Sequence, residues 1–363
     1  MKNRESNIEL LRIVLMIMII THHIIVHGFG LENMVNDFFH HDKNKLYCGL
    51  FINSFVIVGV NTFVFISGYY GMKFKLKVLV SILFQALFYS LFISLLFAVF
   101  NHSTFDWKDL VRSIFPISGN VWWYLGVYLA LYFISPFLNK GVDGIENKQL
   151  MFLLLGLLYL DCFAGFIFKT ISGDGFTVFH FITIYILARF LKKINIIIKK
   201  PIRFFLVSAL VLFCCTLIFV DIHKFAFVWR LFSYNNPLLI FAAIMLFFTF
   251  KNIKVQSNFI NLISSAVFGI YLIHEHPLIR KEIAHFISQV RGKESLSLLM
   301  LYIVCTIVII FTIGSIIELS RKSIFTKMED KFSLMWQKNS IIMDIKKQCY
   351  SFINRSKITK PTT

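Results

Sequence analysis

The sequence predicts an all-α fold, a polytopic transmembrane bundle of about ten helices. Of the 363 residues, 57% are hydrophobic and only 15% are charged, whereas soluble domains carry about 25% charged residues. Apolar runs of about 20 residues, the length that crosses a ~30 Å hydrocarbon core, recur from end to end. These runs are continuously apolar and lack the alternation of a membrane β-barrel.

Ten segments carry this apolar signal. They span residues 8–27, 50–72, 77–100, 121–138, 150–168, 176–191, 204–220, 234–250, 259–280 and 296–318. We assign residues 1–320 to one integral-membrane domain and residues 321–363 to a basic tail. The first segment is expected to be retained, because no small-x-small cleavage site follows it. No internal repeat of the kind found in many transporters is visible.

The basic residues predict the orientation of the bundle. With the N-terminus inside the cell, most Lys and Arg residues fall in cytoplasmic loops and in the tail. Because cytoplasmic loops of membrane proteins are enriched in Lys and Arg, both termini are predicted to be cytoplasmic. The net charge of +18 is explained by these loops and by a tail lying on the anionic lipid bilayer. No nucleic-acid partner is therefore expected.

Polar residues interrupt the first segment. Arg12 and His23 are eleven residues apart, so on a helix they lie within about 20° of one face and about 16 Å apart along the axis. His27 shares this face approximately, whereas His22 points about 80° away. Ionisable groups inside a membrane are costly and mark functional sites. The alternatives are that Arg12 snorkels to the headgroups and that His23 makes an interhelical hydrogen bond.

The second segment also carries polar residues. Asn61 and Ser67 stand among apolar residues, and the segment ends in the letters ISGYY. Three lysines at alternate positions, Lys73, Lys75 and Lys77, follow it. On the cytoplasmic side such a cluster suits a multiply phosphorylated ligand. It is equally typical of a plain topology determinant.

Two later segments carry aromatic or polar groups at their predicted outer ends. The fourth begins with a tryptophan pair that includes Trp123, and aromatic belts are common at that depth. The ninth ends in His274, Glu275 and His276. A carboxylate beside an imidazole holds a histidine tautomer or supplies a proton. We expect His274 and Glu275 to act with His23 if the bundle brings the first and ninth helices together.

A metal site is the competing explanation for the histidines. His22, His23, His27, His40 and His41 all offer imidazoles. The i, i+4 spacing of His23 and His27 would let the two side chains share a zinc ion with help from elsewhere. The six cysteines show no metal-type spacing and are expected to be buried thiols. We expect no metal.

These residues also carry a family resemblance. Arg12 and His23 with ten residues between them resemble the R-x10-H signature of the acyltransferase-3 superfamily. The resemblance continues in ISGYY, in WWYLGVYLALYFISPFLN and in FGIYLIH, in the order in which the family has these motifs. The NIELLR start and the HHIIVHG continuation look most like capsule and exopolysaccharide O-acetyltransferases of Gram-positive bacteria.

The resemblance implies an activity that composition does not reveal. Members of the superfamily take an acyl group, usually acetyl, from cytoplasmic acyl-CoA and place it on a hydroxyl of an extracytoplasmic glycan. It therefore implies acetyl-CoA as co-substrate, a polysaccharide or other envelope glycan as acceptor, and the bacterial plasma membrane as location. The family's essential arginine and histidine map onto Arg12 and His23, with His23 as general base or transient acyl carrier.

The remaining site residues follow from the resemblance together with side-chain chemistry. His274 and Glu275 would orient His23 or bind the acceptor. Trp123 and Asn61 would contact the sugar. Many relatives carry arginines where this chain has three lysines, and lysine lacks the bidentate fork that suits phosphate. The expected contacts to CoA come from Arg12, Lys73, Lys75, Lys77, Ser67 and Tyr69.

Two other classes of function are compatible with a polytopic membrane protein. One is a transporter or flippase for a glycolipid or a polysaccharide precursor. The missing internal repeat and the missing pair of broken helices argue against it. The other is a membrane sensor or assembly partner without catalysis. The sequence makes no prediction of the oligomeric state or of the sugar that is modified.

Overall fold

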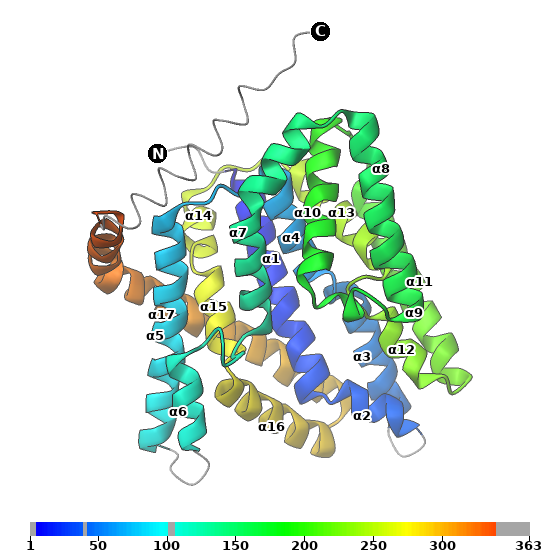
Figure 1. The fold of residues 1–363 in the computed structure, drawn as a ribbon. Helices are drawn as coiled ribbons and strands as arrows, with labels where there is room; N and C mark the ends of the chain where they lie inside the picture. Colours follow the sequence, from blue (N-terminus) through cyan, green and yellow to red (C-terminus); the bar gives the residue numbers. More distant parts are fainter. Residues whose placement is uncertain (1–4, 39–41, 101–105, 339–363) are drawn as a thin grey trace.

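The computed structural model describes residues 5–38, 42–100 and 106–338. Every regular element among these residues is a helix, so the all-α prediction is confirmed for this part of the chain. Helix α1 (Ser6–His23) runs from one end of the bundle toward the other (Figure 1). It continues directly into a short π-helix, η1 (Ile24–Gly28).

The remaining elements follow the predicted apolar segments and add short helices between them. In chain order they are α2 (Leu31–Asn36), α3 (Lys43–Val56), α4 (Gly59–Tyr70), α5 (Leu76–Phe100), α6 (Trp107–Ile114), α7 (Trp123–Gly144), α8 (Asn147–Leu158), η3 (Tyr159–Gly165), α9 (Phe166–Phe168), η4 (Gly173–Gly175), α10 (Val178–Lys193), α11 (Pro201–Asp221), α12 (Phe225–Leu231), α13 (Pro237–Lys251), α14 (Asn258–Ser264), α15 (Val267–His274), α16 (Pro277–Lys293) and α17 (Leu296–Lys338).

Seven helical stretches among the described residues are long and apolar enough to cross a membrane. A bent pair, Asn258–His274 with Pro277–Lys293, would make an eighth. Helices also form at the predicted segments 176–191 and 234–250, but α10 has 16 residues and α13 has 15. At about 1.5 Å per residue they fall short of a ~30 Å hydrocarbon core. About ten crossings and cytoplasmic termini therefore stay predictions.

The ninth predicted segment, 259–280, is not one straight helix, which corrects the prediction. After α15 ends at His274, α16 begins at Pro277, and the two parts are bent by 79°. Proline fits the first turn of a helix, but it cannot continue a helix that precedes it. Helix α16 consequently lies across the end of the bundle that α1 reaches with its last turn (Figure 1).

Polar contacts, among them those of Lys251, gather at the end of the bundle where α1 begins. We call this end the basic end. Lys251, the last residue of α13, donates to Glu5 Oε2 at 2.8 Å and lies 5.5 Å from the ring centroid of Tyr70 in α4. Ser6 donates to Asn261 Oδ1 of α14 at 3.0 Å. These contacts join the start of α1 to α14 and to the ends of α4 and α13. The opposite end, covered by α16, is called the distal end.

Helices α4 and α10 pack against each other at Gly68. A Cβ atom there would lie 2.6 Å from the carbonyl oxygen of Tyr185 and 2.9 Å from the Cβ of Ala188. Such distances leave no room for a side chain. Small residues at a crossing allow membrane helices to approach closely. The glycine of the ISGYY letters therefore has a packing role in this fold.

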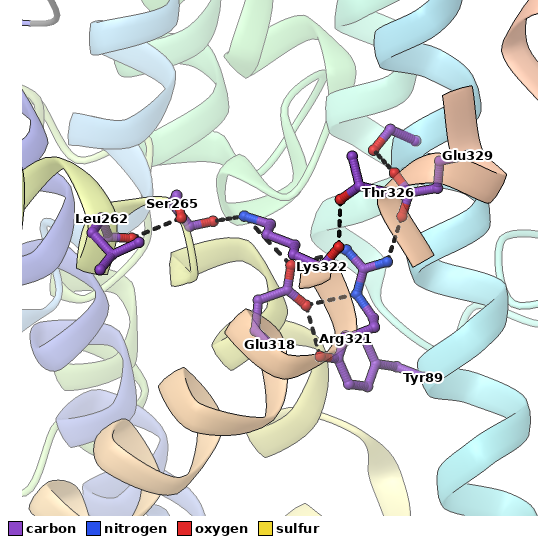
Figure 2. A network of polar contacts seen from close by, with 9 residues as sticks. Tyr89, Leu262, Ser265, Glu318, Arg321, Lys322, Thr326 and Glu329 are labelled. Carbon is purple, nitrogen blue, oxygen red and sulfur yellow. Dashed lines mark hydrogen bonds and ion pairs between the residues drawn. The ribbon is translucent and has the colours of Figure 1, made fainter. Parts of the chain in front are cut away.

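A buried ion network holds α17 against its neighbours (Figure 2). Glu318 accepts hydrogen bonds from Arg321 Nε at 2.8 Å and from the hydroxyl of Tyr89 in α5 at 2.7 Å. Arg321 also pairs with Glu329 at 2.5 Å. Helix α17 thus runs without interruption through the predicted domain boundary at residue 320, and that boundary stays a prediction.

Candidate active site

A cavity of about 460 Å³ lies along α1. From this helix Glu9, Arg12, Met16, Ile19 and His23 line it. Their spacing of three and four residues is that of a single helix face. Arg12 therefore lies toward the basic end and His23 about 16 Å farther along the same face. One continuous space borders both residues of the R-x10-H pattern.

The other walls of the cavity come from four helices and one helix junction. Ile82 of α5 borders it, and the junction between α14 and α15 contributes near the basic end. Most of these walls are aromatic or aliphatic, with a few hydroxyl groups among them. The lining side chains opposite α1 are Val60, Phe63 and Ser67 of α4, Trp123, Tyr124 and Tyr128 of α7, Ser264 and Ser265 of the junction, and Val267, Phe268 and Tyr271 of α15.

Arg12 carries an unpaired charge in this cavity. Among the residues that the structure describes, no carboxylate forms an ion pair with Arg12, and its Nε atom is buried without a hydrogen-bond partner. Arg12 as a whole is half-buried, and a cation partly withdrawn from water without a counter-charge is costly. This end of the cavity is therefore bordered by a guanidinium that pairs with no described carboxylate.

His23 meets two partners at its Nδ1 atom. Nε2 of His274 lies 3.1 Å away and Oε2 of Glu275 lies 2.9 Å away. Both partners come from the end of α15, where Pro277 stops the helix and exposes the last turn to α1. On its other side, Oε1 of Glu275 accepts a hydrogen bond from Nη1 of Arg280 in α16 at 2.5 Å. The bend between α15 and α16 thus assembles the whole cluster.

The hydrogen bonds assign the tautomers in this cluster. Nδ1 of His274 lies 2.7 Å from the carbonyl oxygen of Ile270 and must donate to it. A neutral His274 then presents Nε2 as an acceptor, and the Glu275 carboxylate is also an acceptor. Nδ1 of His23 must therefore carry a proton, and in a neutral His23 the lone pair is then on Nε2. His23 lines the cavity with a side chain that is 15% exposed.

The other histidines of the first helix have different surroundings. His22 is turned away from the cavity, and its Nδ1 lies 2.7 Å from Oδ1 of Asn53 in α3. The ring of His27 lies 5.9 Å from that of His23 and borders a second, small gap beneath α16, which His23 and His274 also line. His40 and His41 lie outside the described residues.

The structure offers one group of metal-type donors among the residues that it describes. The donor atoms of His23, His274 and Glu275 lie within 4.8 Å of one another. One carboxylate oxygen of Glu275 is already taken by the guanidinium of Arg280, and Nδ1 of His274 is taken by a carbonyl. Hydrogen bonds thus occupy one carboxylate oxygen of Glu275 and one ring nitrogen of His274. The expectation that the protein needs no metal stays a prediction.

Several predicted ligand residues lie away from the cavity. Asn61 is fully buried, donates to the backbone oxygen of Tyr234 at 2.8 Å and faces Nε2 of His180 at 2.9 Å. His180 in turn lies 2.7 Å from the buried carboxylate of Asp161. This network ties α4 to α10 and η3, so both ends of the Asn61 amide are engaged within the protein. Of the two predicted sugar contacts, only Trp123 lines the cavity.

Of the residues predicted to contact CoA, some line the cavity and others do not. Ser67 lines the cavity, whereas Tyr69 does not. Lys73 and Lys75 are exposed at the basic end, and Lys77 pairs with Asp330 of α17 at 2.7 Å. These lysines stand outside the cavity lining, and their predicted role stays untested by the geometry.

Two other lysines lie close together at the basic end, and no sequence motif connects them. Lys192 of α10 and Lys251 of α13 lie 5.4 Å and 5.8 Å from the ring centroid of Tyr69. Burial lowers the pKa of Lys192, and the neighbouring charges of Arg189 and Lys251 lower it further. Burial raises the pKa of Glu5, but hydrogen bonds from Lys251 and a tyrosine hydroxyl outweigh this and bring it below its usual value. This end of the bundle therefore gathers several cations, two of which are paired with carboxylates: Lys251 with Glu5 and Arg189 with Asp143.

Comparison with known families decides the class of the protein. The profile of an acyltransferase domain matches residues 5–318. The chain belongs to the acyltransferase-3 family. The match to this acyltransferase domain covers every residue that lines the cavity and the whole cluster around His23. Searches among curated proteins and among solved structures returned no match. The apolar helices and the family together indicate a multi-pass membrane acyltransferase.

Proposed function

We propose that this acyltransferase moves an acetyl group from cytoplasmic acetyl-CoA to a hydroxyl of an extracytoplasmic polysaccharide or other envelope glycan. The observation that carries the proposal is the cavity along α1, which Arg12 borders toward one end and His23 farther along. The proposed location is the bacterial plasma membrane, with the basic end facing the cytoplasm.

The donor would bind from the basic end. Acetyl-CoA is a polyanion, and Arg12 offers a guanidinium that has no counter-charge among the described residues. Lys192 and Lys251 stand at the same end and would meet the nucleotide part. The extended pantetheine arm would then follow the face of α1 over about 16 Å and bring the thioester to His23.

The transfer itself would use His23 as the general base. Nε2 removes the proton from the acceptor hydroxyl as the oxygen attacks the thioester carbonyl carbon. The CoA thiolate leaves and takes the proton back from the imidazolium. Glu275 and His274 hold the ring in the tautomer that leaves Nε2 free. Trp123 offers a wall on which a sugar ring would stack.

The decisive experiment compares the wild type with His23→Ala in a bacterial strain that lacks this gene. Ester-linked acetyl on the purified envelope polysaccharide is measured by proton NMR. We expect the acetyl signal with the wild type and its loss with His23→Ala. His285→Ala, an exposed histidine of α16, is the matched control and should keep the signal. Equal acetylation with and without the His23 side chain would overturn the proposal.

A further inference from the structure

Glu9 places a negative charge next to the proposed anion site. Glu9 and Arg12 are three positions apart on α1, and both line the cavity. Residues at this spacing are neighbours on a helix surface, where opposite charges attract. A Glu9–Arg12 ion pair would occupy the guanidinium that the proposed function assigns to the donor.

In the structure Glu9 has a different partner. The hydroxyl of Ser264, the last residue of α14, donates a hydrogen bond to Oε2 of Glu9. Ser264 is only 6% exposed and lines the cavity at the same end. Within the described part of the chain Arg12 has no ion-pair partner, and its Nε atom is unsatisfied. One carboxylate oxygen of Glu9 is thus held by a neutral donor from another helix.

The position of Ser264 is fixed from a third helix. The next residue, Ser265, offers its backbone oxygen to the ammonium of Lys322 in α17 (Figure 2). Lys322 also lies 3.5 Å from Oε1 of Glu318, in the buried ion network. The junction between α14 and α15 is therefore anchored to α17 while its serine side chain reaches α1.

We propose that Ser264 is a positioning residue that holds the Glu9 carboxylate away from Arg12 and so keeps the guanidinium available to a phosphate group of the donor. The inference rests on the proposed function, because it assumes that Arg12 binds acetyl-CoA. Ser264 takes no part in the chemistry. Its hydroxyl satisfies Glu9, which would otherwise turn to the cation on the next turn of its own helix.

Equilibrium binding of acetyl-CoA to the purified full-length protein tests this inference. Ser264→Ala should raise the Kd about five- to tenfold, the loss expected when a charge-assisted hydrogen bond is weakened. Adding Glu9→Gln to Ser264→Ala should restore the wild-type Kd, because a neutral amide does not compete for Arg12. Ser264→Thr keeps the hydroxyl and should bind like the wild type. Ser208→Ala in α11, whose hydroxyl bonds a backbone oxygen of its own helix, is the control and should leave the Kd unchanged.

Each result separates this role from a structural one. Rescue by Glu9→Gln supports the inference, because a merely structural defect at the helix junction would persist in the double variant. An unchanged Kd in Ser264→Ala, or an equal loss with and without Glu9→Gln, would overturn it while leaving the proposed function standing. If the wild type itself binds no acetyl-CoA, the result contradicts both the proposed donor and the proposed role of Ser264.

Discussion

At the scale of single residues, two buried polar atoms without partners in the described part of the chain belong to side chains that border the cavity. Nε of Arg12 and the hydroxyl of Tyr271 are both buried and unpaired among the described residues, and both side chains border the cavity. By contrast, the buried hydroxyls of Tyr89 and Tyr185 bond Glu318 and Asn139. An unsatisfied buried group costs about 1–3 kcal/mol. A ligand that pairs with such groups recovers this free energy on binding.

The first prediction at this scale concerns Arg12. We expect Arg12→Ala to weaken acetyl-CoA binding about 10- to 100-fold, because a hydrogen bond to a charged group contributes about 1.5–3 kcal/mol. The affinity of Arg12→Lys should lie between those of the wild type and Arg12→Ala, since lysine keeps the positive charge but lacks the bidentate guanidinium. Isothermal titration of the purified protein measures the effect. Arg112→Ala on the exposed face of α6 should bind normally, and unchanged affinity in Arg12→Ala would remove this residue from the donor site.

At the scale of helices, the site depends on the close packing of α4 against α10 and on the break between α15 and α16. Gly68 allows α4 to reach α10, which fixes the wall that carries Ser67. Pro277 ends the ninth segment, so that His274 and Glu275 meet His23 instead of continuing a helix. Both features come from residues that are weak helix formers. Their positions determine where the helices touch.

A glycine substitution tests the crossing of α4 and α10. Gly68→Ala should destabilise the protein by about 1–3 kcal/mol, because the added methyl group overlaps the backbone of α10. The measurement is the thermal unfolding midpoint of the purified protein in detergent. Gly156→Ala in α8 is the matched control, since nothing lies within 4 Å of a Cβ atom there. A Gly68→Ala protein that unfolds at the wild-type temperature would contradict the packing role.

At the scale of the whole molecule, the two ends of the bundle differ in chemistry. The basic end gathers Lys192 and Lys251 beside Tyr69. The distal end is crossed by α16 (Figure 1), and the cluster of His23, His274 and Glu275 lies there. This polarity suits a protein that receives an anionic donor on one side of a membrane and an acceptor on the other. The proposed orientation, with the basic end in the cytoplasm, rests on the positive-inside rule.

Labelling of introduced cysteines tests the orientation. Lys281→Cys in α16 should react with a membrane-impermeant maleimide in intact cells, because the distal end is predicted to face outward. Lys254→Cys, exposed between α13 and α14 at the basic end, should react only after the membrane is permeabilised. The wild type measures background labelling of the native cysteines. The reverse pattern would invert the topology and remove the cytoplasmic donor.

Much of the fold follows from local patterns, but the surroundings of the site do not. The apolar runs predict helices at all ten segments, and the spacing of Arg12 and His23 predicts a shared face. The bend after His274 was not predicted, although Pro277 is a local signal for it. The engagement of Asn61 with His180 was not predicted either, because these residues are 119 positions apart.

The sequence by itself determined the helical membrane class and the alignment of Arg12 with His23, because both depend on the fixed rise and rotation of one helix. Only the tertiary structure decided which other residues join them. It brings His274 and Glu275 next to His23 and lets the hydroxyl of Ser264 donate a hydrogen bond to Glu9. It also places Asn61 outside the cavity lining. The physical reason is that helix docking depends on packing between side chains from distant segments, and such packing leaves no periodic trace along the chain.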